Sequence, residues 1–216
     1  MSQQDRLLLV LGTRLFAEEL FDLVSEIEGF QIEAFVENLE QERCNGTLEG
    51  RPIIWVDHIQ PLANTCQAIC GITTTLRDRF VEQVRAYGVK FATLIHPTAR
   101  VSGMSSIGEG SIISPGVIVA SHTSLGKHVF VNRAALIGHH THIGDYVSIQ
   151  PGANIAGACH IGEKTYIGMG AIVIDHITIG KNSIIAAGAV VTKDVPENVL
   201  VAGIPAKVIK ENVDRK

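Results

Sequence analysis

An aliphatic residue recurs at every sixth position through the second half of the chain, and this period constrains the fold more than any other feature. The series runs from Ile95 to Val191 without a missing member, and every member is Ile, Val or Leu. A period of six fits neither an α-helix, with 3.6 residues per turn, nor a flat strand, with a repeat of two. It fits a short strand followed by a corner, repeated many times, and therefore predicts a β-solenoid.

Three such strands would close one triangular coil of 18 residues, so that residues 18 apart share a column. Successive coils should stack about 4.8 Å apart. The aliphatic residues should point inward, and the small or β-branched residue four positions after each, such as Ala135 or Thr141, should fit the narrow interior. At about 0.8 kcal/mol per buried methylene, truncation of one of these isoleucines should cost a few kcal/mol.

The first half of the chain has a different rhythm, in which apolar runs alternate with segments of helical periodicity. Alternating strands and helices predict a small Rossmann-like parallel α/β domain, here residues 1–94, followed by the solenoid domain, residues 95–216. Ligands of such open sheets bind at the carboxyl ends of the strands. The expected strands are 7–12, 31–37, 52–56 and 67–72, and the expected helices are 14–27 and 76–88.

Composition excludes several classes of function. The net charge of −4 gives no electrostatic case for binding nucleic acid or an anionic membrane. The four cysteines form no C-x-x-C pair, which favours free thiols in a reducing compartment. The start of the chain, MSQQDRLLLVLG, is too short and too acidic for a signal peptide, and no apolar run approaches the roughly 20 residues of a membrane span. We therefore expect a soluble, cytoplasmic protein.

The columns of the solenoid bring several histidines together. His139 should lie at a corner, with Gly157 directly beside it on the next coil. The adjacent column contains His122, His140 and His176. A histidine next to a residue without a side chain leaves room for a ligand against exposed backbone.

The repeat I-G-x-x-[STAV]-x resembles that of the hexapeptide-repeat acyltransferases, which fold as left-handed parallel β-helices. The wider layout narrows the resemblance to the acetyltransferases of nucleotide-linked sugars or sialic acid: an α/β domain, LIHPTARVS at 94–102, the solenoid, and GIPAK at 203–207. The left hand is implied by the resemblance alone, because it breaks the usual right-handed crossover rule.

The resemblance implies a catalytic role for His139. A histidine in the context I-x-H-[DE]-x-x-I-G is the general base of these enzymes, and His139 in IGHHTHIG occupies that position. It would take a proton from the amine or hydroxyl of a sugar that attacks the acetyl thioester, and an imidazole with an ordinary pKa near 6.5 suits this task. The family uses a backbone N–H to stabilise the oxygen that becomes negative, and Gly157 matches that position.

Three positions near the base test the resemblance. Relatives carry Asp or Glu after the base, where this chain has His140, so either the base is weaker or a carboxylate from another strand or subunit compensates; His140 itself is the second candidate for the base. Many relatives have histidine near the acetyl group, where this chain has Ser148. Asn132 matches an asparagine near the site of some relatives, or is an ordinary polar corner residue.

The resemblance also implies the cosubstrate, acetyl-CoA, in a groove between two solenoids of a homotrimer. Met169 and Ala187 match positions along the pantetheine arm, and Lys207 would offer a cation to a phosphate or be an ordinary solvated lysine. If the groove lies between subunits, a monomer lacks a complete site.

The acceptor, a nucleotide-linked sugar, should bind the N-terminal domain. Relatives have a glycine-rich turn close to G-A-G-G-H-G after the first strand, where backbone amides cradle phosphates, and an acidic pair after the second. This chain keeps a single glycine in GTRLFAEE, and Arg14 either replaces the lost glycines by its charge or is an ordinary first-turn residue. The residues that the resemblance assigns to the acceptor are Gly12, Thr13, Arg14, Glu37, Asn38, Gly71 and Thr73.

The favoured function is therefore acetylation of the amino group of a nucleotide-linked amino sugar, with no metal. Alternatives are O-acetylation of a sugar or another small hydroxyl acceptor, and a non-catalytic solenoid. A γ-carbonic-anhydrase-like zinc site is disfavoured, because His140 and His176 share one column and cannot supply three converging ligands, and Lys181 stands where the third ligand would be sought.

Overall fold

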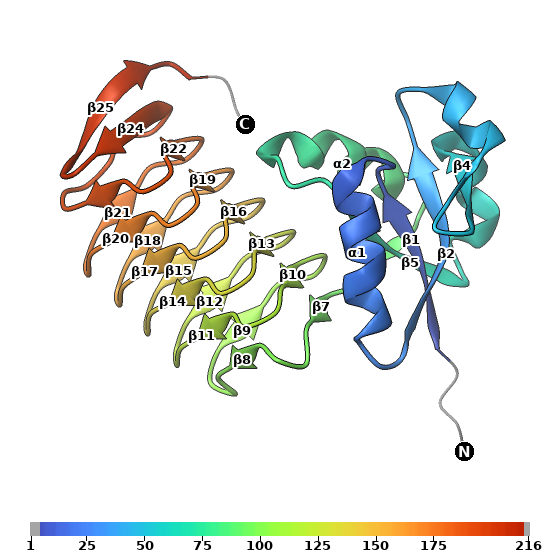
Figure 1. Ribbon diagram of the computed structural model, residues 1–216, viewed down its shortest axis with the longest axis horizontal. Coiled ribbons are helices and arrows are strands. Elements are labelled where there is room, and N and C mark those ends of the chain that lie inside the picture. Colours follow the sequence, from blue (N-terminus) through green and yellow to red (C-terminus); the bar gives the residue numbers. More distant parts are fainter. Residues whose placement is uncertain (1–4, 214–216) are drawn as a thin grey trace. The chain divides into compact units, whose positions relative to one another are not determined.

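The computed structural model describes residues 5–213 (Figure 1). They form two compact units, the first made of residues up to 73 together with 77–94, and the second made of residues 74–76 together with those from 95 onward. The main division falls where the period of six begins. No helix among the described residues is long and apolar enough to cross a membrane.

The first unit is an open sheet of six strands in the order β3-β4-β2-β1-β5-β6. Every neighbouring pair is parallel except β3 with β4, so the predicted parallel α/β layer is confirmed. The strands are β1 (Arg6–Leu11), β2 (Phe30–Glu37), β3 (Thr47–Leu48), β4 (Arg51–Trp55), β5 (Cys66–Cys70) and β6 (Lys90–Phe91). The helices are α1 (Leu15–Ser25) and α2 (Asp78–Arg85), with short 3₁₀ turns η1 (Gln41–Asn45), η2 (Val56–His58), η3 (Gln60–Leu62) and η4 (Thr75–Arg77).

Local sequence explains most of these elements. Residues 8–11 of β1 are fully buried, which is the pattern of a central strand covered on both faces. Helix α1 buries its apolar stripe, Ala17, Leu20, Leu23 and Val24. The segment 76–88, expected as one helix, instead begins with the 3₁₀ turn η4 and ends its α-helix at Arg85, before Gly88 at φ +82°.

The second unit is a solenoid with three faces, and its coils are visible in Figure 1 as a regular stack. Neighbouring strands on each face are parallel, except for the last pair, β24 and β25. Paired residues of adjacent coils are 18 apart, as in the pair Ile137 and Ile155, so the predicted 18-residue coil is confirmed. We name the faces by their number of strands.

The eight-stranded face contains β7 (Leu94–Ile95), β10 (Ile112–Ile113), β13 (Phe130–Val131), β16 (Ser148–Ile149), β19 (Tyr166–Ile167), β22 (Ile184–Ile185), β24 (Val199–Gly203) and β25 (Ala206–Glu211). The six-stranded face contains β8 (Arg100–Val101), β11 (Ile118–Val119), β14 (Leu136–Ile137), β17 (Asn154–Ile155), β20 (Ile172–Val173) and β23 (Val190–Val191). The five-stranded face contains β9 (Ser106–Ile107), β12 (Ser124–Leu125), β15 (His142–Ile143), β18 (His160–Ile161) and β21 (Thr178–Ile179).

The aliphatic series forms the core of this prism. From Ile113 to Val191 every member is at most 4% exposed. The expectation that all members point inward is wrong at the start of the series, where Ile95 is 40% exposed and its neighbour Leu94 is buried instead.

The corners share one backbone conformation. From Gly110 to Gly188 the third residue after each aliphatic has φ between +54° and +72°, although most of these residues are not glycine. A left-handed residue costs about 1–2 kcal/mol when it carries a side chain, so the packed core must offset a repeated local strain. Because each corner turns in the same way, its side chains occupy equivalent places on every coil.

Candidate active site

Two corners of the prism carry most of the site residues predicted for the second unit. We call the corner between the six- and five-stranded faces the histidine corner; it contains residues 120–123, 138–141, 156–159 and 174–177. We call the corner between the eight- and six-stranded faces the asparagine corner; it contains residues 132–135, 150–153, 168–171 and 186–189. Both corners border the same six-stranded face.

At the histidine corner the imidazole of His139 lies against the backbone of Gly157. A Cβ placed on Gly157 would be 2.7 Å from Cε1 and 2.9 Å from Nε2 of His139. The two residues are stacked neighbours, as the 18-residue column predicts, and the N–H of Ala158 donates to the carbonyl oxygen of His139 at 2.8 Å. Any side chain at position 157 would therefore compete with the ring for the same space.

The N–H of Gly157 is free to bind a ligand. Its carbonyl oxygen accepts the N–H of His176 at 3.1 Å, but within residues 5–213 its own N–H has no acceptor. An unpaired amide next to a histidine ring is the pair of groups that acyl transfer needs, a base and a donor for a developing negative oxygen.

His139 is held on its other side by His140. The two Nδ1 atoms are 3.1 Å apart and the rings meet edge to face, with centroids 5.2 Å apart. This contact leaves Nε2 of His139 without a partner among the described residues, next to Gly157. His140 in turn packs on His122 of the preceding coil, with ring centroids 4.7 Å apart.

The asparagine corner holds a second group of predicted residues. Met169, 59% exposed, and Ala187, also exposed, lie on this corner. Asn132 is nearly buried, and its Oδ1 accepts the N–H of Arg133 at 2.8 Å. Ser148 precedes this corner on β16 and is fully buried. A single chain therefore does not bring these residues together with His139.

Lys207 lies on β25, which forms an antiparallel hairpin with β24. Its side chain is exposed, and its backbone pairs with Ala202. A phosphate group could therefore reach its ammonium group.

In the first unit, the residues predicted for the acceptor gather at the carboxyl edge of the sheet. Gly12 follows β1 at φ +107° and its N–H donates to Val36, while Gly71 follows β5 and its N–H donates to Leu11. A Cβ on Gly71 would lie 3.1 Å from Val10 and 3.2 Å from the carbonyl oxygen of Leu11. These glycines are needed for close packing of the two loops.

The carboxylate of Glu37 is already fully engaged. Its Oε1 accepts the backbone N–H groups of Asn38 and Leu39 at 2.9 and 2.8 Å, and that of Glu40 at 3.4 Å. Its Oε2 accepts the hydroxyl of Thr13. Burial raises the pKa of Glu37, but the hydrogen bonds from Thr13 and from these amides outweigh it, so its pKa is lowered overall. With 4% exposure, Glu37 organises the loop after β2.

Arg43 of η1 completes this cluster, and it was not among the residues predicted from the sequence. Its Nε donates to the Thr13 hydroxyl at 2.9 Å and lies 3.7 Å from Oε2 of Glu37. Only the parallel sheet brings η1 beside the loop after β1, so no local motif could have identified this residue.

The remaining predicted acceptor residues are accessible. Arg14 is exposed and forms an ion pair with Glu40 at 2.5 Å. Asn38 is partly exposed and its amide donates to Gln83 at 2.9 Å; Thr73 is also partly exposed. Arg14, Asn38 and Thr73 are thus the side chains of this set that a ligand can reach.

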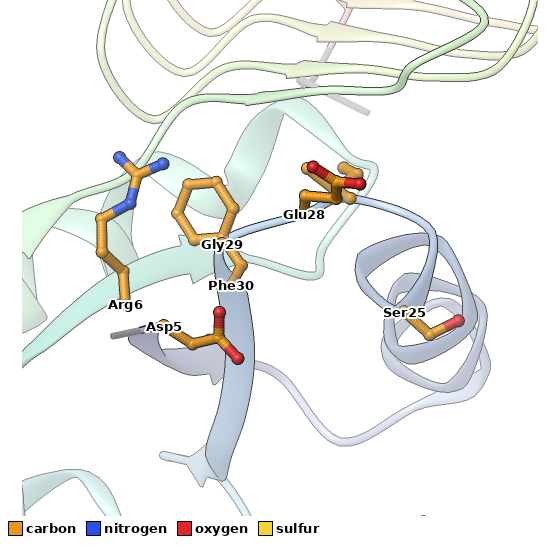
Figure 2. Close-up of a pocket in the computed structure, with 7 residues that line it drawn as sticks. Asp5, Arg6, Ser25, Glu28, Gly29 and Phe30 are labelled. Carbon is orange, nitrogen blue, oxygen red and sulfur yellow. The ribbon is translucent and has the colours of Figure 1, made fainter. Parts of the chain in front are cut away.

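A hollow of about 610 Å³ lies at the opposite, amino edge of the same sheet (Figure 2). Asp5, Arg6, Glu28 and Phe30 line it, and the Arg6 guanidinium stands 3.9 Å over the centre of the Phe30 ring. Ligands of open parallel sheets bind at the carboxyl ends instead, and none of the predicted residues lies here.

The zinc alternative finds no support in the histidine geometry. Among residues 5–213 no group of three His, Cys, Asp or Glu side chains is arranged to hold a metal ion. His176 is paired with Asp175 at 3.7 Å, and Lys181 with Glu197 at 3.8 Å.

Comparisons with known proteins agree with this geometry. Residues 158–193 match the family model described as bacterial transferase hexapeptide (six repeats). Among curated proteins, none matches the chain by sequence.

Several solved structures are similar over almost the whole chain. The perosamine N-acetyltransferase of Caulobacter crescentus, solved with CoA and GDP-perosamine, is 27% identical with a TM-score of 0.86, over 94% of this chain and 97% of that chain. The acetyltransferase domain of PglB from Neisseria gonorrhoeae is 30% identical with a TM-score of 0.86, over 95% and 100%. WeeI from Acinetobacter baumannii is 30% identical with a TM-score of 0.84, over 94% and 100%.

The fold and site define an acyltransferase with a left-handed parallel β-helix. Its features are the stacked hexapeptide repeats, the parallel α/β domain before them, and the histidine next to the backbone of a glycine. The chain belongs to the hexapeptide-repeat sugar acetyltransferases.

Proposed function

We propose that the protein transfers the acetyl group of acetyl-CoA to the amine of a nucleotide-linked amino sugar. The observation that carries this proposal is the contact of the His139 imidazole with Gly157, whose N–H is unpaired. Support comes from the similar enzyme of Caulobacter crescentus, which was solved with CoA and GDP-perosamine.

His139 acts as the general base in this proposal. Its Nε2 takes a proton from the amine as the nitrogen forms a bond to the thioester carbonyl carbon. The Gly157 N–H donates to the carbonyl oxygen as negative charge develops on it. When the carbon–sulfur bond breaks, His139 returns the proton to the departing sulfur, so the residue ends each cycle as it began.

We infer that the complete site forms between copies of the chain in a homotrimer. The histidine corner and the asparagine corner border the same six-stranded face on opposite sides. This face carries Ile118 and Leu136 on adjacent coils and Ile172 two coils further on, each 39–43% exposed, and exposed apolar side chains gathered on one face are typical of an interface.

Three-fold symmetry gives a heterologous contact, in which two different surface patches of the chain meet. Here one edge of the six-stranded face would meet the opposite edge of the six-stranded face of the next copy. The His139 corner of one chain would then meet the Met169 and Ala187 corner of its neighbour. This explains why a single chain separates the two groups of residues.

We place the nucleotide of the acceptor at the carboxyl edge of the first unit's sheet. Arg14 and Asn38 are the reachable polar side chains there, and a diphosphate would compete with Glu40 for Arg14. The cytoplasmic location stays a prediction.

The test is turnover of acetyl-CoA with a panel of nucleotide-linked amino sugars and their hydroxyl analogues. His139→Ala should lower kcat at least about 10²-fold, because it removes the base. His160→Ala, an exposed histidine on the five-stranded face, is the matched control and should keep parent activity. Parent activity in His139→Ala would contradict the proposal, and turnover of hydroxyl analogues alone would reassign the acceptor.

A further inference from the structure

We propose that His140, packed against His122, positions the base His139 as a neutral hydrogen-bond acceptor and so replaces a carboxylate. This inference rests on the function proposed above and deepens it. His140 and His122 are positioning residues here, because neither needs to touch a reacting atom.

The first step is the proton count between the two imidazoles. Their Nδ1 atoms are 3.1 Å apart, and a hydrogen bond between two nitrogens needs one proton between them. Neutral histidine carries a single ring proton, so one ring donates and the other accepts. The pair therefore has two arrangements, and they differ in which nitrogen of His139 is bare.

Only one arrangement leaves a working base. If His139 donates from Nδ1, its Nε2 is bare and faces Gly157, where it can accept the proton of the amine. If His140 donates, Nε2 of His139 already carries a proton and cannot act. After proton transfer His139 is an imidazolium, and its bond to the neutral His140 strengthens because the donor is charged.

The second step is the placement of His140 itself. His140 and His122 occupy the same corner position on adjacent coils, at φ +57° and +58°. Their rings are tilted by 33° with centroids 4.7 Å apart, which restricts rotation of the His140 ring. The next residue in this column is Ala158, whose short side chain does not provide such a contact on the other side.

The third step concerns charge. The same corner holds His122 on the preceding coil and Asp175 and His176 two coils onward, and His142 and His160 pair on adjacent strands of the five-stranded face. Within the described single chain no carboxylate bonds or pairs with His139 or His140; Asp175 pairs with His176 instead. Within this single chain the imidazolium of His139 thus forms without a carboxylate bonded to it, and a protonated His140 can no longer accept its hydrogen bond.

Substitutions separate this role from simple structure. His140→Ala should lower kcat about 10-fold or more, with the KM for acetyl-CoA changed less than about twofold, because only the geometry of the base is lost. His140→Asp should restore turnover and move the acid limb of the kcat/KM profile to higher pH, because an anion favours the protonated base. His122→Phe should retain more activity than His122→Ala, because it keeps a stacked ring.

The control is His160→Phe, which changes an exposed histidine on the five-stranded face, outside both corners, and should leave turnover at the parent level. If His140→Ala keeps both the parent kcat and the parent pH profile while His139→Ala is inactive, the positioning proposal is wrong and the proposed function stands. If His139→Ala is itself fully active, the proposed function has failed.

A spectroscopic measurement tests the proton placement without any substrate. In the ¹⁵N spectrum of the histidine-labelled full-length protein at about pH 8, His139 should show a protonated Nδ1 and a bare Nε2, and His140 a bare Nδ1. The opposite pattern, with the proton on Nε2 of His139, would overturn the proposal.

Discussion

The imidazole of His139 rests on the α-carbon of Gly157, so closely that a Cβ at position 157 would lie 2.7 Å from its Cε1. The base and the unpaired amide are therefore positioned by one contact between adjacent coils. Both depend on the 18-residue stack, because the pairing of β14 with β17 sets the register of the two coils that carry them.

Gly157→Ala should reduce activity through this contact alone. Gly157 is not among the glycines with positive φ, so alanine meets no backbone strain there, but its methyl group must displace the His139 ring. We expect kcat to fall by about 10-fold or more, with the melting temperature nearly unchanged. Gly103→Ala is the control, because a Cβ there has open space. A Gly157→Ala enzyme as fast as Gly103→Ala would show that the contact has no catalytic role.

Glu37 should stabilise the first unit in a pH-dependent way. Because its pKa is lowered in the folded protein, its contribution is fully present above the ordinary value near 4.5 and is lost as the pH falls through the folded-state value. Glu37→Gln should cost about 1–3 kcal/mol near pH 7, since an amide cannot accept all these hydrogen bonds.

Urea unfolding at pH 7 and pH 3 measures this effect. The difference between parent and Glu37→Gln should shrink at pH 3, whereas the exposed control Glu28→Gln should differ little from the parent at either pH. An equal loss at both pH values would mean that the carboxylate charge is not the stabilising feature.

Removal of metal should not change the reaction. The described residues contain no three-ligand group, and the proposed chemistry uses an imidazole and an amide. Dialysis against EDTA should leave kcat within about twofold of the parent value. A large loss that zinc restores would favour the carbonic-anhydrase-like alternative.

The sequence predicted the solenoid well because its signal is repeated. Every sixth residue from 95 to 191 is aliphatic, so seventeen positions indicate the same period. An exception such as the exposed Ile95 does not obscure a signal repeated so often. The closeness of His139 and Gly157 followed from the same arithmetic.

Features that depend on contacts between distant segments could not be predicted. The hydrogen bonds that the Glu37 carboxylate accepts from Thr13 and from three backbone amides are an example, and its role toward the acceptor stays a prediction. Arg43 was missed because only the fold brings it to Thr13. The burial of Ser148 was also not visible in the repeat, because the pattern places its side chain outward on β16.

In the proposed trimer, His139 of one chain works with the asparagine corner of another. Two variants test it: His139→Ala, which lacks the base, and Ala187→Trp, which blocks the exposed asparagine corner. Each should be inactive alone. When both are co-expressed in equal amounts and assemble at random as trimers, every mixed trimer contains one site with both corners intact. Such sites make up about a quarter of all sites in the whole mixture.

We therefore predict that the unfractionated co-expressed mixture regains about a quarter of the parent kcat per chain, and mixed trimers purified by two tags about a third, whereas mixing the purified single variants without subunit exchange regains none. If purified mixed trimers stay as inactive as either variant alone, the two corners do not form a shared site and the account is wrong.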